Sequence, residues 1–107
     1  MMTEERISEL AEKGFKRWQK NGMDRMYINA SALGLNCTYY KTGNISSATL
    51  NGADVSNCEA RRLKAAKTYI DLTREIIVSD SPRLAAAVAD LIGVDEYRYG
   101  ECQIKIN

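Results

Sequence analysis

Residues 36–50 place the strongest restriction on the fold, because they predict a β-hairpin. The runs 36–41 and 45–50 are rich in β-branched and aromatic residues, and Thr42-Gly43-Asn44 separates them. Two such runs around a short turn that contains glycine are typical of antiparallel strands. Asn51-Gly52 adds a second turn signal after the hairpin. The chain is therefore expected to contain an antiparallel sheet.

The N-terminal segment has the apolar spacing of an amphipathic helix over residues 4–20. Its apolar and small residues recur at intervals of three and four: Ile7, Leu10, Ala11, Gly14, Phe15 and Trp18. Thr3 is a suitable N-cap residue. Asn21-Gly22 serves as the stop signal, since glycine accepts the left-handed conformation of many helix C-termini. This prediction places Trp18 in the core.

Two further helices have local start signals. Ser56 and Glu59 form an S-x-x-E capping box, which predicts a helix over residues 57–67 with Leu63 on its buried side. Ser81-Pro82 combines a capping hydroxyl with proline at the first helical position. The helix that begins there has an apolar stripe of Leu84, Ala87, Val88 and Leu91, and Gly93 is expected to end it.

Three other segments read as strands. Residues 25–29 alternate, with Met26 and Ile28 on one side. Residues 68–78 are dense in isoleucine, valine, tyrosine and threonine and favour a second hairpin around Thr73-Arg74. The alternative for 68–78 is a continuation of the preceding helix to Ile77. The last segment alternates again and predicts a terminal strand whose one face carries Cys102, Ile104 and Ile106.

These elements predict one small α+β domain over residues 1–107. The 107 residues, 45% of them hydrophobic, suffice for one core. We expect a mostly antiparallel sheet of about five or six short strands with three helices packed on it, because the elements lack strict βαβ alternation. The apolar side chains of the helices are expected to be used up in the interior. Strand order and oligomeric state are not predicted by these patterns.

The residue types argue against an enzyme, a metal site or a cofactor. The chain has no histidine, which removes the commonest general base and metal ligand. Its glycines match neither dinucleotide-binding nor P-loop spacing. The isolated cysteines Cys37, Cys58 and Cys102 are expected to be buried, reduced hydrophobes. We therefore predict no catalytic, cofactor-binding or metal-binding residue.

Charge and hydropathy predict a cytoplasmic protein without a membrane segment. The net charge is only +1, yet basic residues concentrate in 13–25 and 61–67. No run approaches the roughly 20 apolar residues that a membrane span needs. The N-terminal residues lack the basic start and apolar stretch of a secretory signal.

The leading functional hypothesis is a non-catalytic module that binds another protein. Tyrosine and arginine dominate the energetics of protein interfaces. The candidate partner-binding residues are Arg25, Tyr27, Tyr40, Arg61 and Lys64. We expect Tyr27 or Tyr40 to be an aromatic anchor on the exposed side of the sheet, with Arg25 and Arg61 beside it. The alternative is a small nucleic-acid-binding accessory protein that uses the basic residues of 13–25 and 61–67, because such clusters resemble a phosphate footprint.

A resemblance points in the same direction. Lys16-Arg17-Trp18, Arg25-Met26-Tyr27-Ile28 and Leu50-Asn51-Gly52 followed by Ser56 resemble small uncharacterised proteins of phages and conjugative elements, over roughly residues 16–72. The resemblance implies a cytoplasmic accessory protein of such an element. Compact inhibitors of host defence, including anti-CRISPR and antirestriction proteins, belong to this class. It assigns no functional residue.

Overall fold

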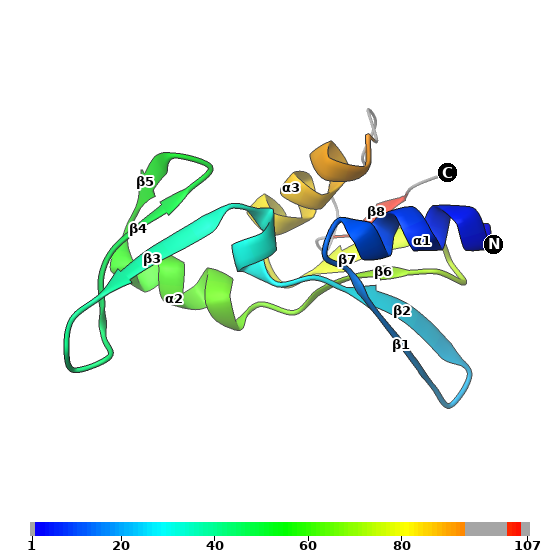
Figure 1. Cartoon of the computed structure of the whole chain (residues 1–107), viewed down its shortest axis with the longest axis horizontal. Helices are drawn as coiled ribbons and strands as arrows, with labels where there is room; N and C mark the ends of the chain where they lie inside the picture. Colours follow the sequence, from blue (N-terminus) through cyan, green and yellow to red (C-terminus); the bar gives the residue numbers. More distant parts are fainter. Residues whose placement is uncertain (1, 94–102, 106–107) are drawn as a thin grey trace.

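The computed structural model describes residues 2–93 and 103–105 and confirms the α+β class (Figure 1). Every strand pairing within these residues is antiparallel. In chain order the elements are α1 (Glu4–Glu12), β1 (Lys16–Lys20), β2 (Met23–Tyr27), the 3-10 helix η1 (Ala30–Leu33), β3 (Leu35–Tyr39), β4 (Ile45–Leu50), β5 (Ala53–Val55), α2 (Asn57–Ala65), β6 (Thr68–Asp71), β7 (Ile76–Ser79), α3 (Pro82–Ile92) and β8 (Gln103–Lys105).

The strands form two sheets, where the sequence had suggested one. β1, β2, β6, β7 and β8 lie in that order in a five-stranded sheet, and β3, β4 and β5 form a three-stranded sheet. The second sheet and α2 are inserted between β2 and β6. They occupy one end of the elongated molecule, and α1 lies over the five-stranded sheet at the other end (Figure 1).

The two faces of the five-stranded sheet differ in burial. Register places Met26, Ile70 and Ile77 in one row across β2, β6 and β7, and all three are buried. Leu10 of α1 and Val88 of α3 belong to the same core cluster. This inner face is thus covered by helices. We call the opposite side, which carries the alternate residues of each strand, the outer face.

The first helix ends eight residues earlier than predicted. Gly14 has a φ of +106°, and Phe15 N donates to Leu10 O at 3.1 Å while Gly14 N donates to Ala11 O at 3.2 Å. These two bonds form a Schellman motif, in which glycine takes the left-handed position and apolar side chains close the helix end. Phe15 and Leu10 are both buried. The prediction of a helix over 4–20 was therefore wrong beyond Lys13.

The residues after the helix form the β1–β2 hairpin. Asn21 and Gly22 have φ values of 52° and 77°, and Lys20 pairs with Met23 across them. Positive φ at both central residues is the signature of the two-residue turn that favours Asn-Gly. The stop signal assigned to a helix is thus a hairpin turn. Trp18 lies on β1 with 38% of its surface exposed, so its predicted place in the core was also wrong.

The local signals for the other hairpin and helix starts are confirmed. β3 and β4 pair around residues 42–44, and β5 adds a short strand that was not predicted. The helix α2 ends at Ala65, two residues early, and its Leu63 is buried. Ser56 Oγ accepts from Glu59 N at 3.0 Å. The carboxylate of Glu59 binds Arg83.

Residues 68–78 form the predicted hairpin of β6 and β7, and the helical alternative is excluded. Ser81 Oγ caps α3 by accepting from Leu84 N at 3.3 Å, and Gly93 ends the helix with a φ of +77°. The predicted terminal strand is present as β8, which pairs with β7. Cys102 and Ile106, placed on one face of that strand, lie outside the described residues.

The cysteines only partly follow the prediction of buried thiols. Cys37 on β3 is half-buried and packs against the core. Cys58 is exposed, because Ala60 and Leu63 form the buried side of α2 and position 58 turns away from it. Cys102 lies outside the described residues. No helix among the described residues has both the length and the apolar content that a membrane span requires.

A side chain at Gly34 is expected to destabilise the fold, because it would be strained and would displace the side chain of Asn51. Gly34 has a φ of +102°, and a Cβ there would lie 1.9 Å from Oδ1 and 2.7 Å from Cγ of Asn51. The substitution Gly34→Ala should lower the free energy of unfolding in urea by about 2 kcal/mol. Gly43→Ala is the matched control, since Gly43 has a φ of +90° but no neighbouring atom within 4 Å. Equal losses in both variants would contradict a role for the Asn51 contact.

Asp24 is expected to make stability sensitive to acid. Arg17 donates to its two carboxylate oxygens at 2.9 and 2.7 Å and also binds Glu4 of α1. The hydrogen bonds from Arg17 lower the pKa of Asp24 below its ordinary value of 3.8. A depressed folded-state pKa contributes stability above pH 3.8 that is lost as the pH falls through the folded value.

Asp24→Asn should therefore flatten the acid limb of stability against pH, measured by urea unfolding from neutral pH downward. Asp54→Asn is the control, because Asp54 is exposed and its side chain, among the described residues, accepts no hydrogen bond and forms no ion pair. If the free energy of unfolding falls as steeply at low pH in Asp24→Asn as in the wild type, Asp24 does not cause the acid sensitivity.

Candidate functional site

Three neighbouring strands bring one arginine and three aromatic side chains together on the outer face. Trp18 of β1 pairs with Arg25 of β2, and Tyr27 of β2 pairs with Tyr69 of β6. Directly paired residues share a face, and so do residues two apart on one strand. We call Trp18, Arg25, Tyr27 and Tyr69 the aromatic–arginine cluster.

The cluster is packed in a defined geometry. The guanidinium carbon of Arg25 lies 4.4 Å from the ring centroid of Tyr69 and 5.7 Å from that of Trp18. The rings of Tyr27 and Tyr69 are 5.0 Å apart at 42°, and those of Trp18 and Tyr27 are 6.2 Å apart at 88°. Cation–π and edge-to-face contacts each stabilise such an arrangement. The side chains are thus held in place without any ligand.

Arg25 retains hydrogen-bonding capacity within the cluster. Its Nη1 donates to the hydroxyl of Tyr27 at 3.0 Å, while its buried Nε has no hydrogen-bond partner. Among the described residues it forms no ion pair. The hydrogen bond to Tyr27 is the chief reason that the pKa of Arg25 is raised above its usual value. The guanidinium is therefore charged, and the Asp71 carboxylate directly opposite on β6 adds to the raised pKa of Arg25 without forming an ion pair with it.

The surroundings of the cluster are exposed and basic. Lys16 and Lys20 alternate with Trp18 on β1, and both are exposed. Met23 at the hairpin turn is 38% exposed, the same fraction as Trp18. Asp71 is the acidic neighbour on β6, but its Oδ1 already accepts from the backbone N–H groups of Thr73 and Arg74, each at 3.1 Å. The outer face thus offers apolar rings between cations.

The structure divides the five predicted partner-binding residues between the two sheets. Arg25 and Tyr27 lie together in the aromatic–arginine cluster. Tyr40, 60% exposed, lies in the connection between β3 and β4, and Arg61 and Lys64 are on α2. Arg25 and Arg61 were expected on one surface, but the structure places them on different elements, β2 and α2. The order of strands along a sheet was not available from sequence periodicity.

Lys64 has a separate partner at the three-stranded sheet. Its Nζ donates to the hydroxyl of Tyr39 at 2.6 Å and lies 4.8 Å from the ring centroid. This hydrogen bond is the main cause of a raised pKa for Lys64. Both residues belong to the lining of a groove of about 430 Å³ between η1, β3 and α2. The predicted basic stretch 61–67 is thus partly engaged in local contacts.

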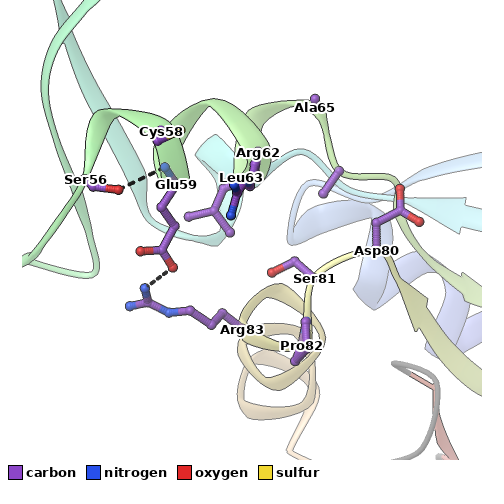
Figure 2. A pocket seen from close by; sticks show the side chains of 11 residues that line it. Ser56, Cys58, Glu59, Arg62, Leu63, Ala65, Asp80, Ser81, Pro82 and Arg83 are labelled. Atoms are coloured by element: carbon purple, nitrogen blue, oxygen red, sulfur yellow. Dashed lines mark hydrogen bonds and ion pairs between the residues drawn. The ribbon is translucent and has the colours of Figure 1, made fainter.

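A second pocket, of about 690 Å³, lies between α2 and the start of α3 (Figure 2). Figure 2 shows Glu59 and Arg83 pointing toward each other, and they form an ion pair. Asp80 accepts the backbone N–H of Lys67 at 3.0 Å. Cys58 also lines the pocket, but the chain has no histidine to activate a thiol. The carboxylates here are used in structural contacts.

The described residues offer no constellation for metal chemistry. Within this part of the chain, no three histidine, cysteine, aspartate or glutamate side chains gather closely enough to hold a metal ion. Comparison of the chain with family models, with curated proteins and with solved structures finds no match. The aromatic–arginine cluster is the most specialised arrangement of side chains among the described residues.

Proposed function

We propose that this protein is a non-catalytic module that binds another protein through the outer face of its five-stranded sheet. The observation that carries the proposal is the aromatic–arginine cluster. Tryptophan, tyrosine and arginine are the residues that most often contribute the largest share of binding energy at protein interfaces. Here they meet on one partly exposed face, beside Met23 and two lysines.

The side chains of the cluster already pack against one another before a partner binds, and this supports a role in binding. Arg25 is held between Trp18 and Tyr69 and bonded to Tyr27. A partner would therefore meet side chains whose rotamers are already restricted, and less conformational entropy would be lost on binding. The rings also contribute apolar area that a partner could cover.

Ring orientation favours a protein over a nucleic acid. A sheet that binds single strands offers free ring faces on which successive bases stack. Trp18 and Tyr27 are nearly perpendicular, so both cannot lie flat toward stacked bases, and Arg25 occupies a face of Trp18 and of Tyr69. The two basic stretches are also separated, since 13–25 reaches the five-stranded sheet and 61–67 contains all three basic residues of α2.

We also propose where the protein acts and which kind of genetic element encodes it. The resemblance over residues 16–72 is the reason to place the protein in the cytoplasm as an accessory of a phage or conjugative element. On that basis its partner would be a component of host defence. This finer assignment depends on the resemblance and not on the geometry of the cluster.

Selection of peptides from a displayed random library on the whole protein tests the binding surface. Such selections favour sites that can contribute binding energy in a small area. We expect Trp18→Ala to weaken the selected peptides at least about tenfold. Tyr40→Ala is the matched control, because Tyr40 is also an exposed aromatic residue on a hairpin. Its replacement should leave the affinity unchanged.

Two results would overturn the proposal. One is a set of selected peptides that lose affinity with Tyr40→Ala and keep it with Trp18→Ala. The other is tight binding of a single-stranded oligonucleotide that falls steeply with salt and is lost in Trp18→Ala. The second result would assign the same face to nucleic acid.

A further inference from the structure

The five-stranded sheet ends in an open edge at β1. This strand pairs with β2 on one side and with no described strand on the other. All five of its residues are exposed, and the β1–β2 hairpin projects from the body of the molecule (Figure 1). An edge strand leaves backbone N–H and C=O groups unpaired, and these can pair with a further strand.

The side chains of β1 give this edge a distinct charge pattern. Lys16, Trp18 and Lys20 alternate on the outer face. On the other side Arg17 is engaged by Asp24 and Glu4, which fixes the hairpin against α1. The outer row therefore reads cation, aromatic, cation, and no acidic residue occurs on the strand.

The same pattern disfavours a second copy of this chain as the added strand. An antiparallel copy centred on Trp18 would set Lys16 against Lys20 at both ends. A parallel copy in register would set each lysine against itself. Like charges directly opposite one another destabilise strand pairs, and lysine on an edge is a common barrier to self-association.

We propose that β1 accepts an extended segment of a partner protein as a sixth strand, and that this segment has the pattern acid–x–apolar–x–acid. Its carboxylates would lie beside Lys16 and Lys20, and its apolar residue would lie against Trp18, whose ring contacts Arg25 on the other side. Backbone hydrogen bonds would supply affinity, and the alternate side chains would supply specificity. The proposal rests on the proposed function and adds the chemistry of the partner.

Two synthetic peptides test the pattern against the full chain. One has the core Glu-Thr-Ile-Thr-Glu with a threonine at each end, and the other has lysine in place of both glutamates. We expect the acidic peptide to bind at least about tenfold more tightly than the basic one. The double variant Lys16→Glu/Lys20→Glu should reverse that preference. Its glutamates would attract the lysines of the basic peptide and repel the glutamates of the acidic one. Amide hydrogen exchange should slow on β1 when the acidic peptide binds.

Several outcomes would contradict the proposal that a partner segment pairs with β1. They are equal affinity for both peptides, a preference that the double variant does not reverse, or protection from exchange that avoids β1. A wild-type dimer in sedimentation whose protected amides lie on β1 would instead assign the edge to a second copy. If library-selected peptides still depend on Trp18 while β1 stays unprotected, the outer face remains a binding surface and only the strand addition fails.

Discussion

Ile70→Ala is expected to lower the free energy of unfolding by about 4 kcal/mol, because it opens a cavity in the centre of the core. Ile70 has no exposed surface and stands between Met26 and Ile77 on the inner face of the five-stranded sheet. Helices cover this row, so the neighbouring side chains can close the space only in part. Urea unfolding followed by circular dichroism measures the loss.

Tyr69→Ala is the matched control, since Tyr69 precedes Ile70 on β6 and points to the outer face. Its ring is half-buried and contacts Arg25 and Tyr27. Loss of these two contacts and of the buried part of the ring should cost about 2 kcal/mol. The comparison separates the face that stabilises the fold from the face assigned to binding. A larger loss in Tyr69→Ala than in Ile70→Ala would contradict the division.

Arg25→Ala is expected to weaken library-selected peptides by about 100-fold, an effect typical of a central interface residue. The guanidinium is charged, stacked between two rings and without an ion-pair partner among the described residues. Removal deprives a partner of its charged contact and loosens the packing of Trp18. Titration of each variant with a labelled peptide gives the dissociation constants.

Arg25→Lys tests what the guanidinium itself contributes. Lysine keeps the positive charge but lacks the planar fork that stacks on rings and donates in pairs, so a loss of about tenfold is expected. Arg61→Ala is the control on α2 and should leave affinity unchanged, because Arg61 is exposed away from the cluster. If Arg25→Ala binds the peptides as tightly as the wild type, Arg25 does not contribute to the interface.

The parts of the fold that were predicted correctly are those with local causes. A hydroxyl at Ser56 or Ser81 caps the helix that follows it, and the Asn51-Gly52 turn joins strands that are adjacent in the chain. Such features depend on a few consecutive residues. The division into two sheets depends on the pairing of β2 with β6, across about forty residues. Periodicity within a strand carries no information about that partner.

The first helix was overextended because two patterns overlap in residues 4–20. Leu10, Phe15 and Trp18 fit the spacing of one helical face, yet Lys13-Gly14-Phe15 completes a Schellman motif. Gly14 as a helix C-terminus and Asn21-Gly22 as a hairpin turn together predict a strand that contains Trp18.

Only part of the candidate site could be predicted, because only part of it depends on neighbouring residues in the chain. Arg25 and Tyr27 are two residues apart on one strand, so their shared face follows from the alternation of β2. Trp18 and Tyr69 join them only through cross-strand register. Neither register could be predicted, because one depended on the misassigned helix and the other on a distant strand. Arg61 and Tyr40 were grouped with them on residue type alone.

We propose that the outer face of the five-stranded sheet is the binding surface, and that the end formed by α2 and β3 is not. Amide chemical-shift mapping of the whole protein with a library-selected peptide tests it most directly. We expect the largest shifts on β1, β2 and β6, around Trp18, Arg25 and Tyr69. Shifts concentrated on α2 and β3, around Lys64 and Tyr39, would contradict it.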